Sequence, residues 1–260
     1  MKESINFDRA ATYYDATRKL PDDVAEGITR ALLAEVRAAG TDRLLEVGIG
    51  TGRMARPLMR AGLRMVGVDI SAEMMGQLLA QLTPEHTPPE LLLGDATALP
   101  FRDGSFKAAM VVHVLHLVAS VEATVREIKR VLAPGGVLLH QTRKPHAGVD
   151  DLWRESYAVL TRLLAERGYQ LKPRLLPEDI RAAISRTGAG LKVIDVTEAS
   201  ETSTVNEEME RIKNRICSWS WPVPEGPLVD AMPDYERWLQ ERTGGSWTDK
   251  TTIELEVWRW

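Results

Sequence analysis

A glycine-rich turn next to an acidic side chain is the segment best equipped for chemistry. Glu46 precedes Gly48, Gly50 and Gly52, after a short apolar run and before a predicted helix. Glycines let the backbone turn tightly and approach a ligand without a clash at Cβ. The dinucleotide pattern G-x-G-x-x-G opens onto a pyrophosphate, but here the third glycine comes one place early, and Arg53 stands where that pattern needs glycine. An acid before the turn also opposes a pyrophosphate, so we expect a ligand that carries an amino group.

Two aspartates follow the next two predicted strands. Asp69 lies 21 residues after Gly48, where a carboxylate can accept charge-assisted hydrogen bonds from two neighbouring ribose hydroxyls. Asp95, in Gly94-Asp95-Ala96-Thr97, could accept an exocyclic amine such as that of adenine. Alone, an aspartate in this setting is more often an Asx-turn residue. The glycine turn and the two aspartates together predict a site for a nucleoside joined to an amino acid.

The elements that must position these residues alternate along the first half of the chain. A helix opens at Pro21 and ends at Gly40, with a buried stripe at four-residue spacing. Further helices are expected from the glycine turn to residue 61, after Ser71, and over 121–132. The predicted strands cover 43–47, 64–69, 91–93, 107–112 and 137–141. This alternation predicts a parallel sheet covered on both faces and doubly wound.

The second half departs from this rhythm and holds all seven tryptophans. We expect helical insertions at 145–175 and 203–245 to form a cap, and a helix after Pro177. Strands at 191–197 and 251–258 are expected to complete the sheet, the second alternating apolar residues with Glu254, Glu256 and Trp258. The predicted organisation is therefore a segment and helix over 1–40, a core over 41–144, the two cap insertions, and sheet completion by 176–202 and 246–260.

The first half resembles a class I S-adenosylmethionine-dependent methyltransferase of the type 11, ubiquinone/menaquinone-methylase-like group. The matching motifs, in the family's order and spacing, are LLEVGIGTG (44–52), GVDIS (67–71), GDATALPF (94–101), FKAAMVVHVLHL (106–117) and EIKRVLAPGGVLL (127–139), with FDRAATYYDATR (7–18) similar to the group's N-terminal segment. The resemblance covers about 1–143 and the closing strand pair. It implies a doubly wound, Rossmann-like, mostly parallel seven-stranded sheet with an antiparallel last strand, and S-adenosyl-L-methionine as cofactor. We expect a cytoplasmic location from the composition, which has a single cysteine and neither a signal-peptide core nor a long apolar run.

The resemblance also implies roles for individual residues. Glu46 would lie near the amino group of the cofactor, Asp69 would hold the ribose, and Arg18 would meet the carboxylate. The residues expected to bind the cofactor are Glu46, Gly48, Gly50, Asp69, Ile70, Met74, Asp95, Ala96, His113, Tyr14 and Arg18.

Catalysis and acceptor recognition depend on residues farther along the chain. His113 and His116 follow the fourth strand, where an imidazole can act near neutral pH if the acceptor must lose a proton; otherwise they only shape the pocket. Rigid aromatic side chains suit a flat or apolar acceptor, or they form the core of the cap itself. The predicted acceptor pocket comprises Tyr14, His116, Trp153, Tyr157, Trp219 and Trp221. We expect no metal, because the histidines between 113 and 146 lack the spacing and carboxylates of a zinc site.

Composition limits the function further. The net charge of −4 gives no attraction to nucleic acid or anionic membranes, so we expect a small-molecule acceptor. The start lacks the apolar core of a signal peptide, no run of 18 apolar residues occurs, and Cys217 is the single cysteine. Two alternatives stay open: a cofactor-binding protein without catalysis, since fold does not imply activity, and an NAD-linked oxidoreductase on a similar sheet.

Overall fold

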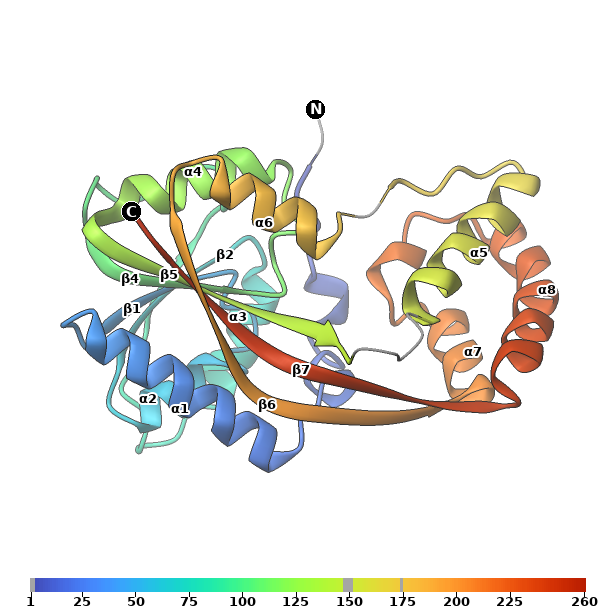
Figure 1. The fold of residues 1–260 in the computed structure, drawn as a ribbon, viewed down its shortest axis with the longest axis horizontal. Coiled ribbons are helices and arrows are strands. Elements are labelled where there is room, and N and C mark those ends of the chain that lie inside the picture. The colour runs from blue at the N-terminus through green and yellow to red at the C-terminus, as the bar shows by residue number, and fades with distance from the viewer. Residues whose placement is uncertain (1–2, 147–151, 174) are drawn as a thin grey trace. The chain divides into compact units, whose positions relative to one another are not determined.

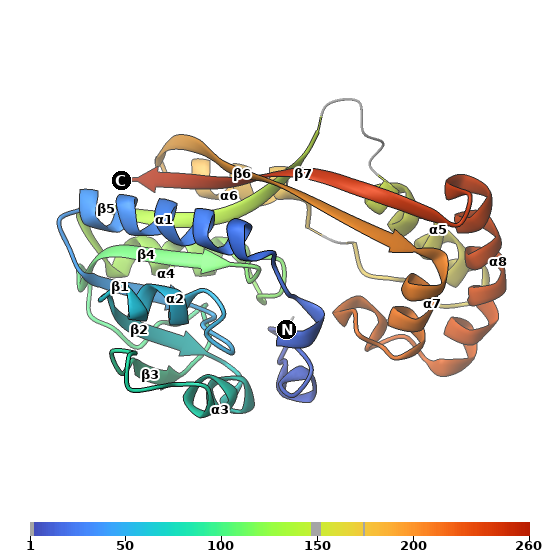
Figure 2. The ribbon, with the colours of Figure 1, turned by 90° about the horizontal axis from the view of Figure 1, so that it is seen from below.

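The computed structural model describes residues 3–146, 152–173 and 175–260, and these contain a seven-stranded sheet (Figure 1). The strand order is β3-β2-β1-β4-β5-β7-β6. The strands are β1 (Arg43–Val47), β2 (Arg64–Asp69), β3 (Glu90–Leu93), β4 (Phe106–Val112), β5 (Leu132–Pro145), β6 (Gly190–Thr204) and β7 (Ser246–Arg259). The sheet is mostly parallel with antiparallel last strands, and Figure 2 shows β7 running against β5. The predicted fold class is confirmed.

The register of the central strands brings their carboxyl ends to one edge. Val47 at the end of β1 pairs with Val68 of β2 and with Val111 of β4, all in parallel. β4 is likewise parallel to β5, with Val112 opposite Gln141. In an open α/β sheet the ligand crevice lies outside the carboxyl ends of the strands. The loops after β1, β2 and β4 therefore meet where a ligand is expected.

Helices cover both faces of this sheet (Figure 1). On one side lie α1 (Asp22–Ala38) and α2 (Ala55–Arg60), and on the other α4 (Val121–Val131) and α6 (Pro177–Ser185). The remaining helix of the alternation, α3 (Ala72–Ala80), begins at Ser71, whose hydroxyl accepts the Met74 N–H as an N-cap. The buried stripe predicted for α1 is confirmed, with Val24, Ile28, Leu32 and Val36 each at most 3% exposed.

The described chain divides into two compact units. The first comprises Met1–Arg143, Leu175–Thr197 and Ile253–Trp260, and the second Lys144–Arg174 and Glu198–Thr252. The first unit includes the short 3₁₀ turns η1 (Asp8–Ala10) and η2 (Asp15–Thr17). The second contains α5 (Leu152–Glu166), α7 (Val205–Lys213), the 3₁₀ turn η3 (Ser218–Ser220) and α8 (Glu225–Thr243). Its helices enclose their own apolar core, so it is a packed unit rather than a long loop.

The last three strands are longer than the sequence pattern predicts. β5 begins at Leu132, where a turn was expected before residue 137, and β6 continues to Thr204. The expectation that 203–204 belong to a helix is therefore wrong. Thr204 is the N-cap of α7, and its side chain exchanges hydrogen bonds with Glu207, which fixes the start of that helix.

From Ile253 to Trp258, the closing strand β7 is buried on both faces rather than one. Its apolar alternation is present, but Glu254 and Glu256 are also buried, at 6% and 1% exposure. His140 Nδ1 lies 3.0 Å from Glu256 Oε2, and Arg181 of α6 donates to Glu256 Oε1 at 2.7 Å. Buried charges persist when they are paired. The partners come from other elements, so the strand pattern alone could not reveal them.

No helix among the described residues is both long enough and apolar enough to cross a membrane.

Candidate active site

The glycine turn adopts backbone conformations that require glycine. Gly48, Gly50 and Gly52 all have positive φ, of 78°, 54° and 71°. A Cβ on Gly48 would lie 2.2 Å from Val114 Cγ2, so the loop after β4 packs directly on the turn. The Gly48 N–H donates to Val68 O at 2.7 Å, which ties the turn to β2. Close packing and this hydrogen bond thus fix the conformation of the glycine turn at the carboxyl edge of the sheet.

Asp69 at the end of β2 fastens the turn from the opposite side. Its Oδ2 accepts the Gly50 N–H at 2.7 Å and its Oδ1 accepts the Ser71 N–H at 2.9 Å. Burial raises the pKa of Asp69, and the backbone N–H groups partly oppose that rise. Each carboxylate oxygen can accept further hydrogen bonds. A partly buried carboxylate with spare acceptor capacity suits a vicinal diol.

Glu46 is the most unusual group at this edge. It is 3% exposed, and its Oε2 has no hydrogen-bond partner within the described residues. Burial raises the pKa of Glu46 well above its ordinary value; the charge of Asp69 adds to the rise and Arg53 opposes it. An unpaired buried polar atom costs stability, so it points to a ligand that supplies the partner. An ammonium group would do so.

Asp95 and the two apolar candidates lie on neighbouring elements. Asp95 Oδ1 accepts hydrogen bonds from the backbone N–H and the hydroxyl of Thr97. This arrangement is the Asx turn that the sequence offered as the alternative role for Asp95. Its Oδ2 accepts the Ser4 hydroxyl at 2.7 Å. Ile70 is half-buried and Met74 of α3 is buried, and a Cβ on Gly50 would lie 3.4 Å from Met74 Cε. Ala96, next to Asp95, is half-buried.

The N-terminal segment is fastened along the same edge by acidic side chains. Asp8 accepts from the Ser71 hydroxyl, and Asp15 accepts from the Thr51 hydroxyl and pairs with Arg56 at 3.0 Å. These contacts bind the segment to the start of α3 and to the glycine turn. Neither Asp8 nor Asp15 was expected from the sequence to hold this segment. Their signal was available only as polar residues inside the 7–18 motif.

Tyr14 and Arg18 lie within this fastened segment. The Tyr14 ring packs edge-on against Phe7, with centroids 5.9 Å apart, and the Arg18 guanidinium carbon lies 5.9 Å from the Tyr14 ring centroid. Arg53 Nη1 donates to the Arg18 carbonyl at 3.0 Å. The segment therefore reaches Arg53, directly after the glycine turn.

His113 occupies the loop after β4 in a left-handed conformation, with φ of 57°. Burial lowers the pKa of His113 well below its ordinary value, and the charges of Arg53, Arg143, His116 and Arg18 lower it further. The imidazole is therefore neutral at pH 7. It can exchange hydrogen bonds but is a weak base. His116 is half-buried three residues later.

Apart from Tyr14, the aromatic residues predicted for the acceptor pocket belong to the second unit. Tyr157 and Trp219 pack against its apolar core. Trp153 is 43% exposed and stacks on Tyr157, with centroids 6.2 Å apart, while Trp221 Nε1 donates to Arg215 O at 2.8 Å. These positions agree with a structural role for Tyr157 and Trp219 within the unit, and their role toward an acceptor stays a prediction.

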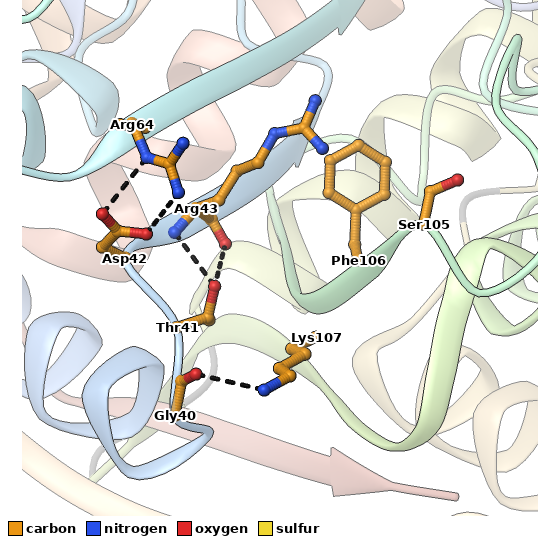
Figure 3. A pocket seen from close by; sticks show the side chains of 8 residues that line it. All are labelled: Gly40, Thr41, Asp42, Arg43, Arg64, Ser105, Phe106 and Lys107. Atoms are coloured by element: carbon orange, nitrogen blue, oxygen red, sulfur yellow. Dashed lines mark hydrogen bonds and ion pairs between the residues drawn. The ribbon is translucent and has the colours of Figure 1, made fainter.

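A separate hollow of about 320 Å³ lies at the amino ends of β1, β2 and β4 (Figure 3). Its charged groups already have partners: Arg64 pairs with Asp42 at 2.6 Å and Lys107 donates to Gly40 O. Arg43 lies 4.8 Å from the Phe106 ring centroid. The hollow is at the edge of the sheet opposite the glycine turn, so it is not part of the candidate site.

Comparison with known proteins agrees with this geometry. The profile of a family described as "Methyltransferase domain" matches residues 45–140. A demethylmenaquinone methyltransferase from Symbiobacterium thermophilum is 30% identical over 181 residues, which cover 65% of this chain and 72% of that protein. The chain belongs to the class I S-adenosylmethionine-dependent methyltransferases, type 11. Its cofactor is S-adenosyl-L-methionine.

Other relatives match over a shorter length. A demethylmenaquinone methyltransferase from Renibacterium salmoninarum is 35% identical over 138 residues. The aligned residues make up 51% of this chain and 55% of that protein. The chain thus spans little more than half of the first curated relatives it matches. Among solved structures, YcgJ from Bacillus subtilis has a TM-score of 0.56 at 18% identity, covering 88% of this chain and 97% of its own. That likeness shows the shared fold.

The residues of this methyltransferase fit its cofactor. The unpartnered Oε2 of Glu46 is a buried acceptor of the kind that an ammonium group requires. Asp69 keeps acceptor capacity for ribose hydroxyls, and a Cβ at Gly50 would approach both Asp69 Oδ2 and Met74 Cε. Charge, hydrogen-bond capacity and space therefore agree with an adenosyl amino acid.

Proposed function

We propose that this chain transfers the methyl group of S-adenosylmethionine to a small-molecule acceptor by in-line displacement. The observation that carries the proposal is the pairing of a buried, unpartnered Glu46 carboxyl with the glycine turn held by Asp69. The family membership supports the same conclusion. The relatives named above act on demethylmenaquinone by their names; for this chain we propose only the class of acceptor.

The cofactor is held, in our proposal, by the carboxyl edge of β1 and β2. Glu46 receives its ammonium group and Asp69 its ribose hydroxyls, while Ile70 and Met74 contact the adenine. Asp95 and Ala96 contact the adenine edge; the Oδ2 of Asp95 can accept one more hydrogen bond beside that from Ser4.

The N-terminal segment covers this site in our proposal. Tyr14 closes over the cofactor, and the Arg18 guanidinium pairs with its carboxylate. The contacts of Asp8 and Asp15 hold the segment against the turn and α3, which excludes water from the reacting groups.

When bound, S-adenosylmethionine supplies an electrophilic methyl group with a neutral thioether as leaving group. The protein must therefore align the acceptor and exclude water. His113 lies in the loop that packs on Gly48, and its neutral ring can hold the acceptor by a hydrogen bond or receive its proton. His116 lines the acceptor side with Tyr14. That Trp153, Tyr157, Trp219 and Trp221 also contact the acceptor stays a prediction from the sequence.

The proposal is tested by binding and then by turnover. Calorimetry with S-adenosylhomocysteine and with NADH should show binding of the former alone. When S-adenosylmethionine is supplied with a panel of acceptors, the enzyme should form S-adenosylhomocysteine together with the methylated acceptor. NADH binding would favour the oxidoreductase alternative, and cofactor binding without methylation of any acceptor would favour the non-catalytic one. His113→Asn, which tolerates the left-handed backbone, should reduce turnover more than cofactor affinity. Unchanged turnover would make His113 a spectator.

A further inference from the structure

Three arginines act electrostatically on His113, and none of them forms an ion pair within the described residues. Arg53 follows the glycine turn, Arg18 ends the N-terminal segment, and Arg143 lies on β5. All three guanidinium groups act on the pKa of His113 and lower it. They come from three separate parts of the first unit, so the fold, and not a basic run in the sequence, assembles them.

The hydrogen bonds of these arginines do not neutralise them. Arg53 donates to the Arg18 carbonyl, and Arg18 donates to the Thr17 carbonyl. Arg143 is exposed and forms no hydrogen bond or ion pair anywhere in the described residues. Carbonyl contacts position a guanidinium but leave its full charge uncompensated.

The acids nearby are already engaged or have a raised pKa. Asp15 raises the pKa of Arg53, but its own carboxylate pairs with Arg56 and accepts from Thr51. Glu46 is buried and its pKa is raised by burial, a rise that the charge of Arg53 opposes. Burial meanwhile lowers the pKa of Arg53, which shows how unfavourable its unpaired charge is. The described acids therefore balance the positive charge of this cluster only in part.

The cofactor cannot balance the remaining positive field either. S-adenosylmethionine has one carboxylate, which Arg18 takes in our proposed function, and its ammonium and sulfonium are both positive. Two guanidinium groups, those of Arg53 and Arg143, then still lack an anion. Arg143 lies two residues beyond Gln141, which pairs with Val112 at the end of β4, so it stands beside the loop that carries His113.

We propose that the methyl acceptor carries a carboxylate or phosphate group, which Arg143 binds together with Arg53 beside His113. This inference rests on the proposed function, whose acceptor it specifies. A guanidinium binds either oxyanion through two parallel N–H donors, which fixes orientation as well as charge. The same field stabilises negative charge that develops when an acceptor hydroxyl loses its proton. That effect compensates for the weak basicity of His113.

Binding to the full-length protein saturated with S-adenosylhomocysteine tests the inference directly. The probes are matched pairs, benzoate with benzamide and phenyl phosphate with phenol, titrated by calorimetry at low ionic strength. We expect the anion of at least one pair to bind more tightly than its neutral partner, and Arg143→Gln to weaken it by about 10- to 100-fold, as the loss of a charged hydrogen bond does. Arg126→Gln, at an exposed arginine on α4, is the matched control and should leave binding unchanged.

Turnover provides the second arm, with 4-hydroxybenzoate and 3,4-dihydroxybenzoate each compared with its amide. The parent protein should methylate each acid faster than its amide. In Arg143→Gln this preference should be lost, with a rise in KM that is larger than the fall in kcat; together these two results would support the inference. Equal binding of anion and neutral probe, or an anion preference that survives in Arg143→Gln, would overturn it. Oxyanion binding at Arg143 without methyl transfer to any acceptor would instead support this site and contradict the proposed function.

Discussion

The variant Asp69→Ala tests whether the Asp69 carboxylate binds the cofactor or only stabilises the fold. In the structure this carboxylate accepts the N–H groups of Gly50 and Ser71, and we propose that it also accepts the ribose hydroxyls. Because its pKa is raised chiefly by burial, the folded protein holds the ionised form at a cost. Removing it thus loses two hydrogen bonds but also relieves a buried charge.

The two effects on stability oppose each other, whereas those on affinity do not. We expect Asp69→Ala to change the free energy of unfolding by no more than about 1 kcal/mol, within the usual net worth of a hydrogen bond. Losing a charge-assisted hydrogen bond to the ribose costs about 1.5–3 kcal/mol, or about 10- to 150-fold in Kd. Affinity should therefore fall much more than stability.

Calorimetry with S-adenosylhomocysteine and its 2′-deoxyribose analogue measures this in a double-mutant cycle. In the parent protein the analogue should bind more weakly, and in Asp69→Ala the two ligands should bind alike. Asp42→Ala is the control, because Asp42 is an exposed aspartate paired with Arg64 at the other edge of the sheet. If the folded Asp69→Ala variant binds S-adenosylhomocysteine as tightly as the parent, or still discriminates the analogue fully, the ribose assignment is wrong.

Three further predictions concern the same edge of the sheet. Burial raises the pKa of Glu46, and an ammonium ligand favours its ionised form. Cofactor affinity should therefore rise with pH, by up to about tenfold per pH unit, until the pH reaches the pKa that Glu46 has in the cofactor-free protein. Calorimetry in two buffers should detect proton release on binding to the parent protein but not to Glu46→Gln, and a parent protein that releases no proton would refute this. Gly48→Ala would place a Cβ 2.2 Å from a valine methyl carbon, at a backbone φ of 78°. Thermal unfolding should show that this variant loses about 2–4 kcal/mol of unfolding free energy and that Gly50→Ala loses clearly less. Equal losses would contradict the packing argument. Asp15→Asn should speed limited proteolysis within residues 1–20 and weaken cofactor binding. The control variant Asp22→Asn, at the exposed start of α1, should do neither. Identical behaviour of the two variants would show that the contacts of Asp15 do not hold the N-terminal segment.

Local patterns in the sequence predicted the first half of the fold well. The stripe Val24, Ile28, Leu32 and Val36 repeats at helical spacing, and Ser71 precedes its helix as a cap. Such signals depend on neighbours within a few residues, so they can be interpreted without the fold. The glycine turn is of the same kind, because positive φ and close approach demand glycine at fixed positions.

The sequence could not show which distant groups meet. Glu46 could be expected near an amino group, but only the buried environment leaves its Oε2 without a partner. The paired burial of Glu256 with His140 and Arg181 joins three elements, and the strand pattern of β7 shows only one of them.

The sequence by itself thus determined the alternating elements, the turn and the acidic residues that follow the strands, because backbone geometry and short-range hydrogen bonding set each of these locally. Only the tertiary structure decided that Arg18, Arg53 and Arg143 converge on His113 and that Asp8 and Asp15 fasten the N-terminal segment. The physical reason is that electrostatic and hydrogen-bond partnerships depend on distance in space and on burial. The parallel register of β1, β2, β4 and β5 brings the ends of these strands to one edge of the sheet, where these partnerships form.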